Sequence, residues 1–531
     1  MTYSTESIDP QPDSTPEERA RRDMWRGLLA GALAMLAMQV AMVLLRQFSD
    51  VSSLLDAMAD ALLLALPMSM FSLSLDLFGA QAKTLMLVGL MAVLLVIGAF
   101  IGRAYARQTA GARRPMWLRA FAIGAVVFAV SLAFMAWFAP NRDPGAFTSS
   151  RSLPLVFQLA AEAIVFSAVL ALSLSMLRRQ DPAPGGVEDE GEASRLSRRK
   201  LATRAALVGV AAGGVGVLGA AVARVANRPT VGVTPAGEIS PAITPNDDFY
   251  VISKNFVDPD PDRGDNWYVT VDGVVRNELK LTRADLEAMA APAFVSTLTC
   301  ISNPVGGPLI GTAEWVGAPL ADVLRKAGVG EGAVKVVFEA EDDYTDSITL
   351  ERAMAPEPML VWQMNGVPLP RLHGTPVRLI VPGIYGMKNV KWLTKITVSN
   401  ENYQGFWQQR GWSDPAIVKT SSRFDVPGDR DVLSVGRTTI GGVAFGGDRG
   451  ISAVEVSFDG GDTWEQATIR ENPSPGGLSW VIWDLMWDAK QGAYDLVVRA
   501  TDGTGEVQTD EHAPELPDGS SGWHRISVGV V

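Results

Sequence analysis

The sequence predicts a multidomain protein with an all-α transmembrane region, an α+β domain and a C-terminal immunoglobulin-like β-sandwich. A chain of 531 residues exceeds what one hydrophobic core usually supports, so several domains are expected. The hydrophobic fraction is 47% and the mean hydropathy is +0.15, with the apolar residues concentrated near the N-terminus. Strand and helix patterns alternate from residue 248, and strands with turns follow from about residue 411. The expected domains are 1–225, 226–405 and 406–531.

The N-terminal region contains five segments that are long and apolar enough to cross a hydrocarbon core, which takes about 20 helical residues. They are 24–45, 84–101, 117–138, 153–177 and 205–222. A sixth apolar segment, 51–78, carries Asp56, Asp60 and Asp76, and carboxylates are unfavourable in lipid. We therefore expect this segment to form interfacial helices outside the bilayer.

Basic residues predict the orientation of these helices, because Lys and Arg concentrate in short cytoplasmic loops. Three arginine-rich clusters lie at 19–26, 103–119 and 178–204. Five crossings with a cytoplasmic N-terminus put all three clusters in the cytoplasm. The sequence thus predicts a multi-pass protein of the cell membrane whose later domains are extracytoplasmic.

A twin arginine, Arg198 and Arg199, precedes the Gly/Ala-rich stretch "KLATRAALVGVAAGGVGVLGAA". This pattern is similar to a twin-arginine export signal placed inside the chain. A positively charged stop before an ordinary helix explains the same residues equally well. Export in the folded state would suit a protein that receives its cofactor in the cytoplasm.

The membrane region itself offers few groups for chemistry. The only cysteine and all three histidines, His373, His512 and His524, follow the predicted helices, so a haem conduit is not expected. Glu162 is the one ionisable group deep in a predicted span, which gives thin support to a transporter or sensor. A hydrogen-bonding role inside the bundle is the favoured interpretation of Glu162.

The α+β and sandwich patterns rest on local signals. Thr282 with Asp285 three residues later predicts a capped helix start, and Gly328 predicts a helix end. Strands split by DGG and DGTG turns, as in "VEVSFDGGDTW" and "VVRATDGTGEV", predict the immunoglobulin-like sandwich. The linker "QDPAPGGVEDEGEAS" separates the membrane helices from the region that carries the twin arginine.

Cys300, in "FVSTLTCISNPVGG", is the only cysteine of the chain, so it has no disulfide partner within it. Its position after a predicted strand and before an Asn/Pro/Gly loop would place the thiol at a strand end facing a cleft. Three interpretations remain open at this point: a buried inert thiol, a nucleophile assisted by a histidine, and a soft metal ligand. A single protein ligand requires a metal that brings its other ligands on an organic cofactor.

Three motifs resemble the sulfite oxidase superfamily of molybdenum enzymes. They are "VSTLTCISNPVGG", "WVGAPLADVLRKAGV" and "NGVPLPRLHGTPVRLIVPGIYGMKNVKWLTKI". The C-terminal "VEVSFDGGDTW" strands are similar to the immunoglobulin-like dimerisation domain of that family. The resemblance covers about 241–531, and the N-terminal helices lie outside it.

The resemblance implies a molybdenum-molybdopterin cofactor (Mo-MPT), with the Cys300 thiolate as a ligand and catalytic group at the metal. His373 and Arg378, in "LPRLHGTPVR", match contacts to the pterin and its phosphate. A planar guanidinium such as that of Arg378 suits a pair of phosphate oxygens.

Two further segments match the cofactor site of the family. In "GMKNVKWL", the backbone of Asn389 and Val390 and the side chain of Lys391 match a second cofactor-binding loop. In "FYVISKNF", Asn255 and Lys254 match a segment that lines the metal pocket. Lys254 is thereby expected among the catalytic residues.

The chain departs from the pattern of sulfite-oxidising members at three places. Lys254 and the "NPVGG" loop stand where those members have arginines, and Trp412 stands where they have a tyrosine. These groups bind sulfite or assist electron transfer, so sulfite as substrate is in doubt. Lys254 and Arg410 still supply positive charge, and a small anion stays open as the substrate.

The expected function is a membrane-anchored, extracytoplasmic oxidoreductase that moves two electrons or an oxygen atom on a small substrate. Oxidation of a sulfite-like oxyanion and reduction of a sulfoxide or N-oxide are both open. The alternative is a non-catalytic membrane-anchored binding or sensor protein. Expected partners are the membrane, a cytochrome or quinone as electron-transfer partner, and a second copy in a homodimer. The net charge of −12 argues against nucleic acid.

Overall fold

The computed structural model divides into two compact units, Met1–Arg228 and Pro229–Val531, each described here by itself. The residues described by the structure are 15–45, 54–65, 70, 82–110, 112, 115–138, 152–178, 209, 211–220, 222–223, 237–254, 258–259, 266–474 and 476–531.

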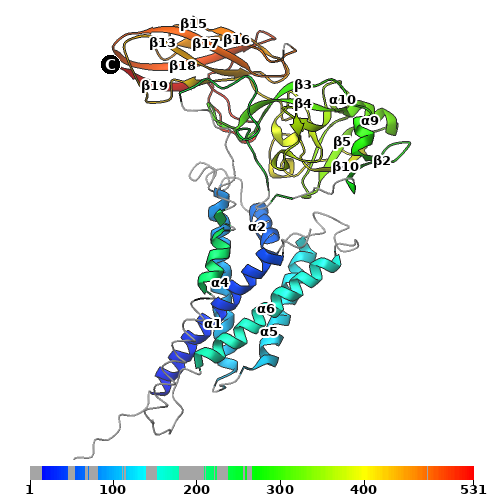
Figure 1. The fold of residues 1–531 in the computed structure, drawn as a ribbon, viewed down its shortest axis with the longest axis vertical. Coiled ribbons are helices and arrows are strands. Elements are labelled where there is room, and N and C mark those ends of the chain that lie inside the picture. Colours follow the sequence, from blue (N-terminus) through cyan, green and yellow to red (C-terminus); the bar gives the residue numbers. More distant parts are fainter. Residues whose placement is uncertain are drawn as a thin grey trace, which may run out of the picture. The chain divides into compact units, whose positions relative to one another are not determined.

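Four long helices form the first unit, and each is apolar enough to cross a membrane (Figure 1). They are α1 (Pro16–Leu45), α4 (Ala82–Gln108), α5 (Trp117–Phe138) and α6 (Ser152–Arg178). These helices confirm four of the five predicted spans. Their length and composition fit a membrane anchor.

The fifth predicted span, 205–222, lies partly outside the described residues. The structure describes a helix over Ala211–Ala220 there, within the predicted span. Four long spans are found among the described residues, and the fifth stays a prediction. In the segment 51–78, the structure describes α2 (Leu54–Ala65), and the interfacial placement of this segment stays a prediction.

Glycines allow α1 and α4 to approach closely. A Cβ atom at Gly31 of α1 would overlap the carbonyl oxygen of Gly98 of α4, and one at Gly102 would overlap that of Gly27. Both helices thus present a glycine pair with GxxxG spacing at one crossing. Arg178 at the end of α6 bonds Asp23 of α1 with Nε to Oδ1 at 2.7 Å, which joins α6 to the same helix.

The α+β domain of the second unit contains two sheets. In the first, β1 pairs with β10 in parallel and the other neighbours are antiparallel. Its order is β2 (Leu279–Thr282), β1 (Tyr268–Gly273), β10 (Leu393–Ser399), β5 (Lys335–Ala340), β6 (Thr345–Thr349). The second sheet has the order β3 (Phe294–Thr299), β4 (Ile310–Pro319), β7 (Met359–Met364), β8 (Val367–Pro368), and β9 (Arg378–Ile380) also pairs with β7.

Three short helices accompany these sheets, α8 (Arg283–Glu287), α9 (Leu320–Ala327) and α10 (Leu350–Ala353). The predicted capping box is present at the start of α8, where Thr282 and Asp285 bond each other's backbone N–H groups. Gly328 ends α9 in the left-handed conformation with φ 72°, as predicted. One face of α9 is buried in the core that both sheets share.

The C-terminal domain consists of two sheets packed around one core, as expected for a sandwich. One sheet has the order β11 (Ser421–Val426), β13 (Gly436–Phe445), β17 (Val481–Ala489), β16 (Thr468–Glu471). The other has the order β12 (Val432–Leu433), β19 (His524–Val530), β18 (Gly492–Asp502), β14 (Ile451–Ser457), β15 (Glu465–Gln466). The immunoglobulin-like assignment of this sandwich stays a prediction.

The sandwich contacts the strand that leads to the cysteine. The backbone N–H of Thr297 in β3 donates to the carbonyl of Leu478 at 3.0 Å. The N–H of Trp480 donates to the hydroxyl of Thr297 at 2.8 Å. Strand β3 is therefore hydrogen-bonded to the C-terminal domain three residues before Cys300.

Candidate functional site

Cys300 follows the last residue of β3, and only 8% of its surface is exposed. Its backbone N–H donates to the carbonyl of Leu309 at 2.9 Å and closes the loop that leads to β4. Its Sγ lies 3.1 Å from the hydroxyl of Ser302. Burial raises the pKa of the Cys300 thiol, while hydrogen bonds from Ser302 and from the N–H groups of residues 301 and 302 oppose this shift.

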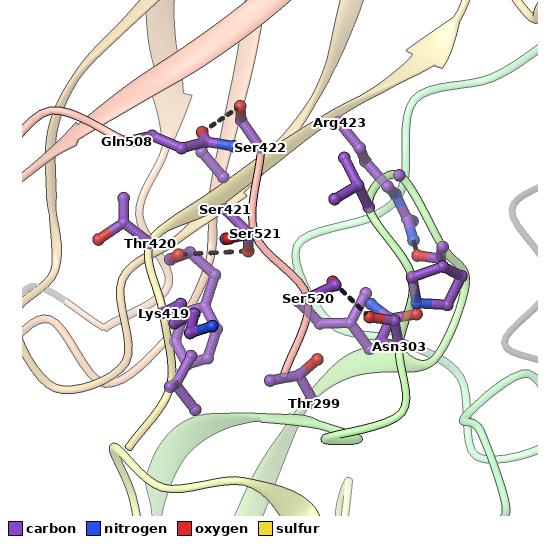
Figure 2. Close-up of a pocket in the computed structure, with 18 of the residues that line it drawn as sticks. Thr299, Asn303, Lys419, Thr420, Ser421, Ser422, Arg423, Gln508, Ser520 and Ser521 are labelled. Carbon is purple, nitrogen blue, oxygen red and sulfur yellow. Dashed lines mark hydrogen bonds between the residues drawn. The ribbon is translucent and has the colours of Figure 1, made fainter. Parts of the chain in front are cut away.

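A cavity of about 50 Å³ lies beside Cys300, between the α+β domain and the sandwich (Figure 2). Hydroxyl and amide side chains dominate its wall, among them Ser422 and Gln508, which bond each other at 2.7 Å. Lys419 also lines the cavity, and its Nζ donates to the carbonyl of Gly519 at 2.6 Å. A cavity of this size and polarity has room for water or for a small polar molecule.

His373 and Arg378 lie together, as the motif that contains them predicted. One guanidinium nitrogen of Arg378 donates to the carbonyl of His373 and the other to that of Asn389, both at 3.0 Å. Burial lowers the pKa of Arg378 to about 10, so it remains charged at neutral pH. Burial also lowers the pKa of His373 to about 4, with the charges of Arg378 and Lys391 acting in the same direction. His373 is therefore a neutral imidazole at pH 7.

The surroundings of Arg378 fit an anionic group. Its side chain is buried, its bonds within the described structure go to carbonyl oxygens, and its Nε has no hydrogen-bond partner there. A buried guanidinium is stabilised when a carboxylate or phosphate neutralises its positive charge and accepts its hydrogen bonds. The phosphate of a molybdopterin is such a group, so these residues fit the cofactor.

The second predicted loop lies against the first. The Asn389 side chain accepts from the N–H of Val381 at 2.6 Å, and the carbonyl of Val390 accepts from the N–H of Leu379 at 2.9 Å. Lys391 donates to the carbonyl of Leu372 at 3.1 Å, in the turn that carries His373. The loop is thus fixed to β9, and Lys391 reaches the histidine turn.

Tyr250 links the thiol to this group. Burial raises the pKa of its phenol well above the usual range, and the charges of Cys300 and Arg378 act on it with opposite signs. Tyr250 and Cys300 belong to one buried cluster with Trp315, and the Arg378 guanidinium lies 5.6 Å from the centre of the Trp315 ring. No motif singled out Tyr250, although it is the second residue of the quoted "FYVISKNF" segment.

Lys254 is buried, and its Nζ donates to the backbone carbonyl of Asp342 at 2.6 Å. The carboxylate of Asp342 lies 3.9 Å from the same nitrogen. The ammonium also lies 5.6 Å from the ring centre of Phe406, over which the Arg410 guanidinium stacks at 3.6 Å. Lys254 and Arg410 thus share one aromatic neighbour, and a carboxylate partly offsets the charge of Lys254.

Trp412 packs edge-on against Trp407, which in turn contacts Phe406. Its indole Nε1 is buried without a hydrogen-bond partner among the described residues. Trp412, Lys254 and the pair His373 and Arg378 are not part of the cavity wall, which of the predicted site residues contains only Cys300. Asn255 lies outside the described residues.

A buried charge network includes Lys388, which lies in the loop that contains Asn389 and Val390, and no sequence motif indicated it. Lys388 bonds Asp346 at 2.9 Å and Asp414 at 3.1 Å, and Lys335 bonds Asp414 at 2.7 Å. Tyr344 donates to Asp346 at 2.9 Å. Burial raises the pKa of Asp346 despite the charge of Lys388. The residues of this network come from separate strands and loops, so no short sequence motif predicts it.

Two family models match the second unit. The "Oxidoreductase molybdopterin binding domain" matches residues 257–407, and the "Mo-co oxidoreductase dimerisation domain" matches residues 416–530. Fold and site thus define a molybdopterin-binding protein of the oxidoreductase class.

Curated relatives agree with this assignment. Sulfite oxidase of Arabidopsis thaliana is 32% identical over 349 residues, with 54% of this chain and 88% of that protein covered. Sulfite oxidase of Gallus gallus is 33% identical over 333 residues, with 53% of this chain and 72% of that protein covered. Mitochondrial sulfite oxidase of Mus musculus is 37% identical over 257 residues, covering 42% of this chain and 47% of that protein.

The chain belongs to the sulfite oxidase family. It spans about half the length of the mammalian relatives it matches. The comparisons indicate molybdenum-molybdopterin as the cofactor. The four long apolar helices precede both matched domains.

Proposed function

We propose that this chain is a membrane-anchored, extracytoplasmic molybdenum oxidoreductase that transfers two electrons or an oxygen atom on a small substrate. The observation that carries the proposal is that Cys300 belongs to one buried cluster with Trp315, and that the Arg378 guanidinium lies 5.6 Å from the centre of the Trp315 ring. A thiol can bind a metal, and a buried guanidinium can bind a phosphate. One buried region that contains both groups suits a cofactor that carries a metal and a phosphate.

The cofactor, when bound, supplies the two-electron redox chemistry at its metal. The chain's own residues hold and orient it. In this proposal Cys300 ligates the metal, and His373, Arg378 and Lys391 hold the pterin and phosphate. The backbone of Asn389 and Val390 completes that contact.

Lys254, Asn255 and Trp412 are proposed to line the substrate side of the metal. The Asp342 carboxylate close to Lys254 reduces the positive charge there, which favours a substrate of low negative charge. A sulfite-like oxyanion and a sulfoxide or N-oxide remain the two substrate classes. A cytochrome or quinone would exchange the electrons.

The organisation of the whole chain is part of the proposal. The domains are 1–225, 226–405 and 406–531, the last of them an immunoglobulin-like domain that forms a homodimer. The description of the matched dimerisation domain supports the homodimer. The internal twin arginine is proposed to direct export, with the N-terminus in the cytoplasm.

Elemental mass spectrometry on the purified protein tests the proposal. Protein from a host that makes molybdopterin should hold about one molybdenum per chain, since the fold offers one thiolate site. The Cys300→Ser variant should keep its circular dichroism spectrum and lose both the metal-thiolate absorption and turnover, because serine is a poor soft ligand.

Wild-type protein without molybdenum, from a host shown to load related enzymes, would contradict the proposal. The chain would then keep the fold as a non-catalytic binding or sensor protein. Turnover unchanged in Cys300→Ser would remove the thiolate from the mechanism.

A further inference from the structure

Ser302 is the polar side chain bonded to the Cys300 sulfur. Its Oγ lies 3.1 Å from Sγ, a short distance for a hydrogen bond to sulfur. Ser302 is half-buried in the loop after β3 and takes no part in the functions proposed above. The backbone N–H groups of residues 301 and 302 also interact with this sulfur.

The loop that carries Ser302 is held at several points. The Asn303 side chain accepts from the N–H of Leu309 at 2.8 Å, within the loop. From the sandwich, the hydroxyl of Ser520 donates to the carbonyl of Asn303 at 2.7 Å, as Figure 2 shows. Arg423 donates to the carbonyl of Gly307 at 2.8 Å. These bonds fix the backbone that follows Ser302, and the bond from the N–H of Cys300 to the carbonyl of Leu309 fixes the backbone that precedes it.

The Ser302 hydroxyl would lie beside a thiolate if Cys300 binds the metal. A thiolate carries no proton, so the Ser302 hydroxyl must donate and the sulfur must accept. A donor to sulfur withdraws electron density that the sulfur would otherwise give to the metal. Hydrogen bonds to ligating sulfurs are among the groups that set the reduction potential of a metal centre.

We propose that Ser302 is a positioning residue whose hydrogen bond to Cys300 raises the reduction potential of the molybdenum centre. The inference rests on the proposed role of Cys300 as metal ligand. The sandwich takes part, because Ser520 and Arg423 hold the loop in which the bond forms.

The test compares reduction potentials of loaded wild type, Ser302→Ala and Ser302→Thr, after the molybdenum content of each is measured. Ser302→Ala should load metal and shift to a more negative potential. We expect a shift of roughly tenfold in the ratio of oxidised to reduced centre, about 59 mV for a one-electron step. Ser302→Thr, which keeps the hydroxyl, should stay near the wild-type value. As a matched control, Ser527→Ala removes an exposed hydroxyl bonded to Asp495 and should leave the potential unchanged.

A second measurement does not need the metal. Cys300 is the only cysteine, so the S–H stretching band in a Raman spectrum of the cofactor-free chain reports this thiol alone. The band should shift in Ser302→Ala and not in Ser527→Ala.

The outcomes separate this inference from the proposed function. Equal potentials in loaded wild type and Ser302→Ala would overturn the role of Ser302 and leave the enzyme proposal standing. An unshifted S–H band would also overturn it. Wild type that binds no molybdenum would instead remove the function on which the inference rests.

Discussion

Arg378 carries a positive charge in a buried position, which is unfavourable without an anionic partner. It is buried, charged and bonded to carbonyl oxygens, and its Nε has no hydrogen-bond partner in the part of the chain that the structure describes. Its replacement by lysine keeps one charge but loses the planar set of donors. We expect Arg378→Lys to weaken cofactor retention about tenfold, a value in line with one charge-assisted hydrogen bond.

The measurement is molybdopterin and molybdenum per chain after extended dialysis. Arg371→Lys is a matched control, because Arg371 is exposed and also donates to backbone carbonyls. Equal retention in both variants would show that Arg378 does not hold the cofactor.

His524 makes the stability of the sandwich depend on pH. Its Nδ1 accepts from the N–H of Phe424 at 3.0 Å, so the bond requires the neutral ring. Burial lowers the pKa of His524 to about 4, from an unfolded value of about 6.5. The unfolded chain therefore binds the proton first, and stability is lost as pH falls from about 6.5 towards 4.

We expect a loss of roughly 2 kcal/mol from His524 between pH 7 and pH 5. Denaturant unfolding at both pH values measures it. A His524→Asn variant should show a smaller difference, while His512→Asn, at an exposed site, should keep the wild-type difference. An unchanged pH dependence in His524→Asn would contradict the assignment.

At the scale of elements, the buried charge network joins the loop that contains Lys388 to Asp346 and to Asp414, in the segment before the sandwich. Lys388 is 1% exposed and Asp346 fully buried. Removing only the cation leaves an uncompensated buried carboxylate, so Lys388→Met should destabilise the second unit by roughly 3–5 kcal/mol. Thermal unfolding of the full chain in detergent provides the measurement.

The double variant Lys388→Met, Asp346→Leu should recover part of the stability that Lys388→Met loses. No recovery would show that Lys388 and Asp346 are not energetically coupled.

The glycine pairs of α1 and α4 make a second prediction at this scale. Gly31→Leu should separate the two helices, because a Cβ there meets backbone of α4. Gly89, also in α4, has open space around its missing Cβ, so Gly89→Leu is the matched control. Resistance of the helical unit to proteolysis should fall in the first variant only. Equal resistance in both would contradict the close crossing.

For the whole molecule, the number of crossings decides where the site lies. An odd number puts the two C-terminal domains on the opposite side from the N-terminus, and an even number puts them on the same side. We expect a reporter fused after Val531 to be active only outside the cytoplasm, as five crossings require. A reporter active in the cytoplasm would mean that the four long helices are the complete set of crossings.

Much of this architecture could be predicted from the sequence, because hydropathy, helix-capping residues and short motifs are local features of the chain. Hydropathy located four helices, and Thr282 and Gly328 marked helix ends. The "LPRLHGTPVR" motif predicted that His373 and Arg378 lie together, and they do. Tertiary proximity was not visible, so the network of Lys388 and the bond from Ser302 to Cys300 were missed. The described helix over 211–220 lies within the predicted span 205–222, and the other residues of that span lie largely outside the described part of the chain.

The contacts of the sandwich with the cysteine loop also set an order of events in time. Ser520 lies 217 residues after its partner Asn303, and Trp480 lies 183 residues after Thr297. A ribosome must therefore have added Trp480 and Ser520 before these bonds can close. We expect the strand and loop around Cys300 to reach their final hydrogen bonding only after the sandwich has been translated.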